Sequence, residues 1–538
     1  MSYIWIFPKH LIRCLIKGNY GKSLVGPTLD DGGEASSIEA HHHDEEGRDI
    51  SLNKTIITGA HHNDDEGKNT LLNSTIIPGR KMRRSPGGTW TSRMKKGLVT
   101  ITGAIPPVGG VPIGKIIGFL LNLFWPESQP DIWSLIKDQV EGLIDEKILE
   151  FELQERRNEI RAIQKTMRSY VDARIREKGS WISTLIHACN ELFYKLTQSK
   201  NSMQFIPLVV THSTLHLLIL KERLLHGKEM YVEDNTEVWR KELEDQISSY
   251  KDFIKDIYAK WVEWRKSKIN VKVGASFNTF MRFRWVQYVE IYDEMGKDSV
   301  KYYDPFSSGP YVPDHFRPIC EGVKRKIFGF RNGEMLQILV PTFYLDNFIP
   351  GNEDNPSVIP SAMSIASFGP ISPQLDGGDE SSRLYSPDDD NTGGGDVTSI
   401  NVRQDHFFYL SEEWSFIESF QVFYSTGAGS IYGGSSGAKL HKIPLDNRRV
   451  KSIQFCYDDS KQAEVTIRFS DGNSTGPMGI RAWGPLRCVN TGGIDTYGLY
   501  NIRAADNKHL INSYTKRAFF QIELDYKAYP VRPSELHN

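Results

Sequence analysis

FIPLVVTHSTLHLLILKERLL, from Phe205 to Leu225, is the stretch that decides how the N-terminal half of the chain folds. Pro207 lies in the first turn of the helix that this stretch predicts, where the missing N–H of proline costs little. The rest of the helix is apolar nearly all round, and such a helix must be surrounded by other helices in a folded, water-soluble protein. The sequence therefore predicts a bundle with this helix at its centre.

Amphipathic stretches on both sides of the apolar helix supply its covering. Asp131 is the predicted N-cap of the first of them. In each stretch apolar residues recur at three- and four-residue spacing, so that one face is buried and charge stays outside. These positions are Ile132, Ile136, Val140, Leu143, Ile144, Ile148, Ile160, Ile163, Met167 and Tyr170, then Trp181, Leu185, Cys189, Leu192 and Leu196, and finally Trp239, Leu243, Ile247, Tyr250, Ile254, Ile257, Trp261 and Trp264. We expect helical structure from Thr100 to about Lys268.

The second amphipathic stretch and the apolar helix form a pair with the dimensions of a membrane hairpin. They run from about Lys178 to Leu196 and from about Met203 to Leu225. Helices of about 19 to 22 residues span roughly 28–33 Å, close to the hydrocarbon thickness of a bilayer. In lipid the pair would satisfy its backbone internally and present one apolar and one polar face, as a pore lining requires. The alternative, which physics alone favours, is a well-buried core helix.

The candidate pore hairpin includes the apolar positions Trp181 to Leu196 of its first helix and seven residues of its second. These seven are Pro207, Thr211, His212, Ser213, His216, Leu217 and Leu220, among which Thr211, His212 and Ser213 form a polar seam. His212 and His216 lie one turn apart, a spacing that could ligate a metal. Because no acidic or Cys partner accompanies them, buried and hydrogen-bonded histidines are the favoured interpretation. We predict no metal and no cofactor.

The pattern changes after Tyr302-Tyr303-Asp304-Pro305. Short alternating runs such as VKSIQFCY (Val450 to Tyr457), AEVTIRF (Ala463 to Phe469) and FFQIELDY (Phe519 to Tyr526) are separated by Gly- and Asn-rich turns, which is typical of an antiparallel β domain. An acidic, Gly-rich segment from about Ser364 to Val402 is expected to be a mobile loop. Turns in this half could form a receptor surface, with Tyr424, Tyr432, Trp483 and Tyr497 as exposed aromatic contacts, although packing roles are equally open for each.

A leader of about 98 residues precedes the helical region. It carries a 20-residue repeat, HHHDEEGRDISLNKTIITG followed by HHNDDEGKNTLLNSTIIPG, and lacks hydrophobic periodicity, so we expect it to be mostly disordered. A solvated polar tract is favoured over weak metal binding by its histidines. The stretch GRKMRRSPGG after the repeat offers Lys81, Arg83 and Arg84, beside Arg80, as a cut site for a trypsin-like protease, or is an ordinary linker. Removal of the leader as a pro-segment is a hypothesis.

Composition limits the classes of protein to consider. The chain has 538 residues, with Lys+Arg 65 against Asp+Glu 67 and a formal charge of −2, and this near balance argues against a nucleic-acid binder. Its mean hydropathy is −0.42. No apolar run reaches the roughly 18 residues of a membrane span, which argues against a resident membrane protein in the folded state. The broken apolar pattern at the N-terminus does not resemble an ordinary secretory signal.

The cysteines and the possible enzyme motifs give little evidence for a function. Five scattered cysteines without CxxC spacing predict free buried thiols, with a Cys456–Cys488 bridge between strands as the alternative. Gly433 to Gly437 satisfies GxSxG around Ser435, but it lies in a Gly/Ser turn between β runs, whereas a hydrolase nucleophile needs a strand before it and a helix after it. We therefore predict no catalytic residues and no enzyme.

Longer stretches resemble a known family of insecticidal toxins. FIPLVVTHSTLHLLILKE (Phe205 to Glu222) is similar to the central helix of the N-terminal domain of Cry-type δ-endotoxins, and FNTFMRFRWVQYVEIYDEMGKDSVKYYDP (Phe277 to Pro305) to the end of that domain. The B component of Pir-type binary toxins is the closer match. IPPVGGVPIGKIIGFLLNLFWPESQPDIW (Ile105 to Trp133) resembles its first helices and FFQIELDYKAY (Phe519 to Tyr529) its last strand. About 230 residues follow Pro305, too few for a full three-domain δ-endotoxin.

The resemblance implies an α+β multidomain chain. Its domains would be a leader at 1–98, a helical pore-forming bundle at 99–305, and an antiparallel β-prism-like domain at 306–538 that binds a receptor or partner. The expected function is that of an insecticidal pore-forming subunit that binds a gut epithelial surface, inserts the hairpin and oligomerises. A small A-type subunit is the expected partner, and the expected location is extracellular, after release without a signal peptide. The alternative is a lectin-like carbohydrate-binding protein with a helical scaffold.

Overall fold

The computed structural model describes residues 112–125, 146–231, 234–278, 284–295, 299–304, 317–371, 395–409, 412–433, 439–457, 462–479, 487–506 and 520–537. Several predictions made from the sequence lie outside these residues and stay predictions. They concern the leader with Lys81, Arg83 and Arg84, the N-cap Asp131, Ser435, and Trp483.

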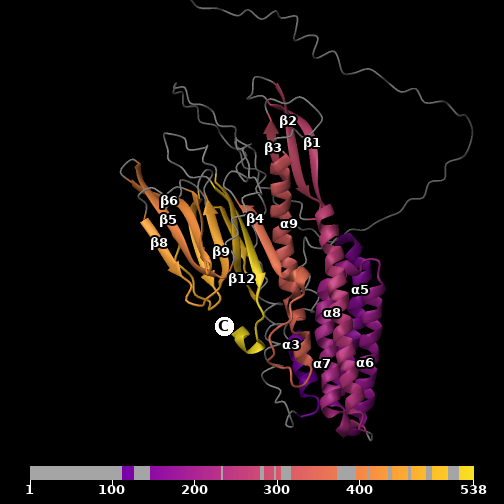
Figure 1. Ribbon diagram of the computed structural model, residues 1–538. Coiled ribbons are helices and arrows are strands. Elements are labelled where there is room, and N and C mark those ends of the chain that lie inside the picture. Colours follow the sequence, from indigo (N-terminus) through magenta and orange to yellow (C-terminus); the bar gives the residue numbers. More distant parts are fainter. Residues whose placement is uncertain are drawn as a thin grey trace, which may run out of the picture. The chain divides into compact units, whose positions relative to one another are not determined.

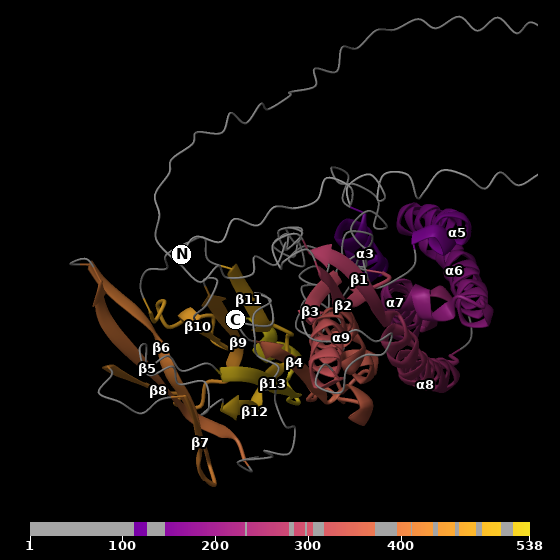
Figure 2. The same ribbon diagram turned by 90° about the horizontal axis from the view of Figure 1, so that it is seen from above.

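The helical half is a bundle with one central helix. Its members are α3 (Lys115–Phe124), α5 (Glu146–Asp172), α6 (Ile175–Gln198), the short 3₁₀ helix η2 (Ser202–Phe205), α7 (Ile206–Met230) and α8 (Thr236–Ser267). The central helix α7 contacts α3, α6 and α8, and Figure 2 shows it enclosed by these helices and by α9 (Arg317–Leu339). Its residues are buried almost without exception, so the predicted central position of this apolar helix is confirmed.

The predicted stripes on the other helices face this core. On α5, Ile160, Ile163, Met167 and Tyr170 are buried. The stripe of α8 is buried from Trp239 to Trp261, and only its last member, Trp264, is half-buried. Each of these two helices therefore turns an apolar face toward the shared core.

A three-stranded antiparallel sheet follows the bundle. Its strands are β1 (Ile269–Asn278), β2 (Arg284–Asp293) and β3 (Ser299–Asp304), in that order, and β1 continues from the end of α8 (Figure 1). Ile269, Val289 and Ile291 form a small core with Cys320 and Val323 of the next helix. The predicted helical domain, 99–305, therefore contains strands in its last part, although its boundary remains a prediction.

A helix that the sequence pattern did not predict lies at the start of the predicted β domain. This helix, α9 (Arg317–Leu339), runs into a 3₁₀ segment, η4 (Val340–Phe348), and a single 3₁₀ turn, η5 (Ser361–Met363), follows. Three glycines weaken the helical signal of α9, and they lie where β4 passes. A Cβ atom on Gly329 would come within 2.3 Å of the Ser367 carbonyl oxygen, and one on Gly333 within 2.5 Å of the Phe368 ring. Close packing against a strand therefore overrides low helix propensity.

Most of the remaining described residues form three antiparallel sheets. Their strand orders are β7-β6-β5-β8, β10-β9-β11 and β12-β13-β4, and each sheet contacts the other two around a shared core. The strands are β4 (Ile365–Ile371), β5 (Val397–Tyr409), β6 (Glu412–Tyr424), β7 (Gly427–Gly433), β8 (Lys439–Pro444), β9 (Val450–Tyr457), β10 (Gln462–Phe469), β11 (Arg487–Gly492), β12 (Tyr497–Asp506) and β13 (Phe520–Ala528), and a 3₁₀ turn, η7 (Pro533–His537), follows. The predicted fold class, a helical bundle followed by a β-prism-like domain, is confirmed.

The predicted mobile loop at 364–402 is too long. Strand β4 occupies its beginning and pairs with β13, while the first residues of β5 occupy its end. Burial of Ala366, Phe368, Ile400 and Val402 explains why these stretches are ordered. The acidic segment between the two strands lies outside the described residues.

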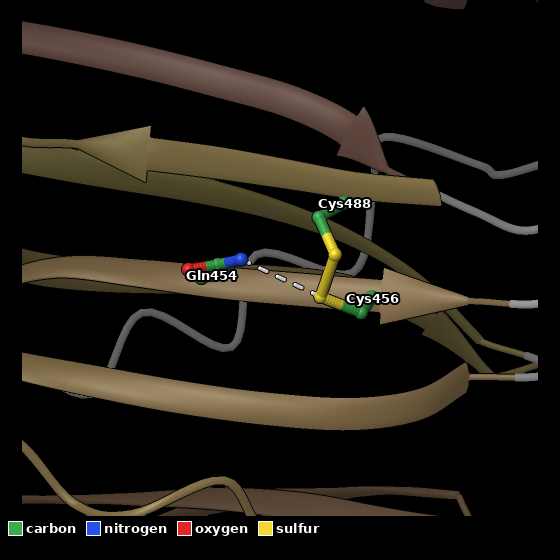
Figure 3. Close-up of a disulfide and its surroundings, with 3 residues drawn as sticks. All are labelled: Gln454, Cys456 and Cys488. Atoms are coloured by element: carbon green, nitrogen blue, oxygen red, sulfur yellow. Dashed lines mark hydrogen bonds between the residues drawn. A yellow bond between two sulfur atoms is a disulfide. The ribbon is translucent and has the colours of Figure 1, made fainter. Parts of the chain in front are cut away.

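A disulfide joins two neighbouring strands of one sheet. Cys456 of β9 and Cys488 of β11 lie directly opposite each other, with Cα atoms 4.0 Å apart (Figure 3). The prediction of free thiols is wrong for this pair, because the strand register brings two residues 32 positions apart into contact. It is confirmed for Cys189 and Cys320, which are buried and free.

Candidate membrane-insertion hairpin

Helices α6 and α7 form the hairpin that the sequence predicts. The turn between them is short, and α7 begins directly after η2. On α6 the predicted positions Leu185, Cys189, Leu192 and Leu196 are fully buried against the core, whereas Trp181 is half-buried. Every predicted position of α7, from Pro207 to Leu220, is buried. The structure therefore brings the predicted hairpin residues together, while their part in a pore stays a prediction.

The polar seam of α7 satisfies its own hydroxyl groups. Thr211 Oγ1 donates to the Pro207 carbonyl at 3.0 Å, and Ser213 Oγ donates to the Val210 carbonyl at 2.9 Å. Such bonds to the preceding turn travel with the helix, because donor and acceptor belong to the same segment. The seam can therefore leave the bundle without losing these partners.

The two histidines of α7 are bound to neighbouring helices. His212 Nε2 lies 2.9 Å from the Cys189 carbonyl oxygen, and His216 Nδ1 lies 3.0 Å from Tyr250 Oη. The second ring nitrogen of each histidine has no hydrogen-bond partner among the described residues. Burial lowers the pKa of His212 to about 4 and the pKa of His216 well below its ordinary value, so both rings are neutral near pH 7. The interpretation as buried, hydrogen-bonded histidines is confirmed.

Three consecutive charged residues end the apolar part of α7, and all three are buried. Lys221 Nζ donates to Glu353 Oε1 at 3.3 Å, and Arg223 pairs with Glu242 of α8. Burial lowers the pKa of Lys221, and the Glu353 carboxylate opposes this shift. These three residues are not among the predicted site residues. The sequence signal that could have identified them is a run of charges within a helix expected to be enclosed. Buried charges need partners, so such a run indicates buried polar contacts.

Glu222 lies at the centre of a second polar cluster, which joins four elements. Its Oε1 accepts hydrogen bonds from the Gly114 backbone N–H before α3 and from the Tyr170 hydroxyl of α5 at 3.0 Å. Lys178 of α6 lies over the Tyr170 ring, 4.5 Å from its centroid, and donates to the Tyr170 carbonyl. Burial raises the pKa of Glu222, while the Gly114 amide opposes this shift. The open end of the hairpin is therefore closed by buried polar contacts.

Helix α8 connects the bundle to the segments that follow it. Lys251 Nζ binds Asp346 Oδ2 of η4 at 2.8 Å, and Tyr258 Oη donates to Asn332 Oδ1 of α9 at 2.8 Å. Arg265 pairs with Asp293 of β2, and neither side chain is exposed. These contacts fix α8, which lies outside the hairpin, to both α9 and β2.

The predicted receptor residues are not all at the surface. Tyr424 and Tyr497 are 5% and 3% exposed, so the expectation of exposed side chains is wrong for these two. Tyr424 Oη donates to Asn501 Oδ1 at 3.3 Å, and Tyr497 donates to the Met363 carbonyl. Each hydroxyl therefore has a partner inside the fold. Tyr432 lies in β7, opposite Phe420 of β6.

Among the described residues, one helical stretch has the length and composition of a membrane span. It covers Ser202–Met230, and 94% of its most apolar window is buried. No group of three His, Cys, Asp or Glu side chains suited to a metal occurs in the part of the chain that the structure describes. The candidate site among these residues is therefore the buried apolar helix.

Comparison with known proteins assigns the helical region. Residues 98–296 match the family model of the delta endotoxin N-terminal domain. This region is therefore similar to a delta-endotoxin N-terminal domain. Among curated proteins, it is similar to pesticidal crystal protein Cry8Ca of Bacillus thuringiensis subsp. japonensis, at 23% identity over 207 residues, and to Cry7Aa of Bacillus thuringiensis, at 27% over 208 residues. These matches cover 36% and 35% of this chain but only 16% and 18% of the relatives' length.

Solved structures extend the similarity beyond the endotoxin domain. The insecticidal crystal protein Cry7Ca1 of Bacillus thuringiensis superposes with a TM-score of 0.51 at 14% identity, covering 82% of this chain and 76% of that chain. This likeness concerns the fold alone. PirB is also similar, with a TM-score of 0.46 at 14% identity, covering 83% of this chain and 96% of PirB. The resemblance of the helical half to Cry-type toxins is confirmed.

Proposed function

We propose that this protein is an insecticidal pore-forming toxin subunit whose α6–α7 hairpin enters the membrane of a host cell. The supporting observation is an apolar helix of spanning length that is enclosed by amphipathic helices in the folded protein. The endotoxin domain and the names of its curated relatives, which are pesticidal crystal proteins, support the insecticidal character. The proposal requires no catalytic residue.

In the proposed insertion, α7 leaves the apolar faces of the neighbouring helices and enters lipid. In water, α7 is stable because the apolar faces of its neighbours cover it. In lipid the hydrocarbon replaces that cover, and the helix keeps its backbone hydrogen bonds within itself. Its partner α6 buries one face and carries charge on the other, so several hairpins could place their polar faces toward a common water-filled centre. Oligomerisation is therefore part of the proposal.

The partners follow from the resemblance and from the β domain. We assign binding of a host receptor, glycan or protein, to the three-sheet domain, and we propose a small A-type subunit as a companion. The protein would act outside the cell that makes it, at the surface of a gut epithelial cell. Cleavage at Lys81, Arg83 or Arg84 would remove the leader before insertion.

Dye release from liposomes tests the proposal. Vesicles made with target gut lipids would be mixed with the protein alone, with trypsin-treated protein, and with each of these plus an A-type partner. We expect leakage in at least one combination, with a rate that rises more steeply than linearly with protein concentration. Absence of leakage in all four would refute pore formation and favour the lectin-like alternative, which glycan-array binding would then examine.

A further inference from the structure

The charged end of α7 is connected to three different parts of the protein. Lys221 binds Glu353, which follows η4, while Glu222 binds Gly114 and Tyr170, and Arg223 binds Glu242 of α8. The contacts of Glu222 and Arg223 remain within the helical bundle. Only the Lys221 contact leads away from it, into the segment that precedes the three-sheet domain. This ion pair is therefore a direct link between the hairpin and the rest of the chain.

Lys221 depends heavily on this one partner. Its side chain is 0% exposed, and Glu353 is its only ionic partner among the described residues. An ammonium group that is shielded from water and loses its counter-ion is strongly destabilising, whereas an apolar side chain in the same place is not. The position of Glu353 thus contributes to the stability of α7 inside the bundle.

Glu353 is held in place by a compact loop. The Asn347 side-chain amide donates to the carbonyl oxygens of Asn352, Glu353 and Asn355, at 2.8, 3.2 and 2.8 Å. The Gly351 backbone N–H donates to Glu353 Oε2 at 2.8 Å, which leaves Oε1 for Lys221. The carboxylate is therefore oriented before it meets the lysine.

The same loop is bound to the C-terminal end of the three-sheet domain. Ser357 N donates to the Val531 carbonyl at 3.0 Å, and Val531 N donates to Ser357 Oγ at 3.1 Å. Ser534 N donates to Asp354 Oδ1 at 3.2 Å. A movement of the segment after β13 would therefore move the loop that carries Glu353.

We propose that the Lys221–Glu353 ion pair is a latch, through which the three-sheet domain holds the pore hairpin in the bundle until displacement of the 349–357 loop releases it. This inference rests on the proposed function, because it assigns a trigger to the proposed insertion. When the loop moves away, Lys221 is left unpaired in a dry site, and α7 gains by leaving the bundle.

A second ion pair provides a matched control. Lys251 binds Asp346 and so connects η4 to the bundle, but it belongs to α8, which is not part of the hairpin. Its side chains are 35% and 28% exposed, so water screens this pair. Breaking it loosens the segment before Glu353 without leaving a buried charge on α7.

The test compares four full-length proteins: wild type, Glu353→Gln, Lys221→Met and Asp346→Asn. Dye release would be followed from phosphatidylcholine–phosphatidylethanolamine liposomes after trypsin treatment, and circular dichroism would establish that each variant is folded. We expect Glu353→Gln to release dye roughly tenfold faster, because the lysine is left without its partner. Lys221→Met should be no faster than wild type, and Asp346→Asn should stay within about twofold of it.

Two outcomes separate the latch from the proposed function. If wild type leaks but Glu353→Gln is no faster than Asp346→Asn, the latch is refuted and the pore remains. If no protein leaks, the pore is refuted, and the latch is decided by amide hydrogen exchange of α7 in solution. Faster exchange in Glu353→Gln than in Asp346→Asn would then support it, and equal exchange would refute it. If Glu353→Gln proves unfolded, amide hydrogen exchange of α7 replaces the leakage measurement. It then compares Lys221→Met with Asp346→Asn, and we expect slower exchange in Lys221→Met.

Discussion

His212 and His216 are neutral side chains enclosed in the bundle, and this makes the bundle sensitive to acid. Unfolded histidine has a pKa near 6.5, while burial lowers the pKa of folded His212 to about 4. Between about pH 4 and pH 6.5, His212 binds a proton in the unfolded chain but stays neutral in the folded chain. Stability is therefore complete above about pH 6.5 and falls as the pH decreases toward 4. Glu159 and the Cys189 carbonyl oppose the pKa shift of His212, Arg223 adds to that of His216, and the Tyr250 hydroxyl bonds to His216.

We predict that wild type loses about 2 kcal/mol through His212 alone between pH 7 and pH 5. In His212→Gln this share of the pH dependence should be absent. Urea unfolding at the two pH values, followed by circular dichroism, measures the difference for each protein. Equal pH dependence of the two proteins would contradict the assignment.

Gly227 of α7 packs directly against the Trp239 ring of α8. A Cβ atom at this position would lie 2.1 Å from the Trp239 ring, so the ring would have to move. Overpacking of this kind costs about 1–3 kcal/mol, which exceeds the gain in helix propensity of roughly 1 kcal/mol. Gly227→Ala should therefore lower the urea midpoint. Gly118→Ala on α3, where nothing lies within 4 Å, should leave it unchanged or raise it. A shift in the same direction for both would show that the ring contact does not matter.

At the scale of single elements, α7 must remain one uninterrupted helix for the proposed insertion. Ser213→Pro removes a backbone donor from the middle of α7 and clashes with the preceding turn, which costs about 3 kcal/mol or more. We predict that it abolishes dye release. Ser213→Ala removes only the hydroxyl and should release dye like wild type. Circular dichroism must show a folded bundle for both, and release by folded Ser213→Pro would argue against a continuous membrane helix.

The disulfide fastens an edge strand. Strand β11 lies at the edge of its sheet, and its bond to β9 closes a loop of 32 residues. Constraint of the unfolded chain by a loop of that length is worth roughly 3–4 kcal/mol. Cys488→Ser should lower the free energy of unfolding, measured by urea denaturation, by a corresponding amount. Wild type in dithiothreitol should be as unstable as this variant. A variant as stable as the oxidised wild type would show that the bridge contributes nothing.

Elements were predictable where burial follows a regular period. The stripe Leu243, Ile247, Tyr250 and Ile254 defines α8, and alternation in VKSIQFCY defines β9 with both of its ends. Helix α9 was not predicted because three glycines interrupt its hydrophobic period. These glycines allow β4 to pack closely against the helix, and β4 lies too far along the chain for a local pattern to show this. The pairing of Cys456 with Cys488 was likewise open, because strand register decides it.

At the scale of the whole molecule, the position of proteolysis is the clearest prediction. Trypsin should cut between Arg80 and Ser85 and leave a stable fragment that retains the described bundle and sheets. N-terminal sequencing and the mass of the fragment identify its ends. Replacing Arg80, Lys81, Arg83 and Arg84 by Gln should preserve the leader. A fragment that begins beyond Gly114 would contradict the proposed pro-segment, because Gly114 binds Glu222 inside the bundle.

The hairpin could be found from the sequence, but its attachments could not. A pair of helices of spanning length, the second of them apolar nearly all round, is visible in the residues themselves. The partners of its charged end are remote, since Gly114 and Glu222 are 108 positions apart and Lys221 and Glu353 are 132 apart. Charges in an enclosed helix indicate that partners exist, whereas only the folded chain shows which residues they are.

The glycine face of α9 has a mechanical consequence. Where β4 crosses Gly329 and Gly333, backbone meets backbone and aromatic ring without an intervening flexible side chain on the helix. Gly329 and Gly333 themselves have no side chain that could change rotamer and absorb a small displacement. A shift of β4, and of β13 to which it is paired, would therefore press directly on the backbone of α9, which continues into η4.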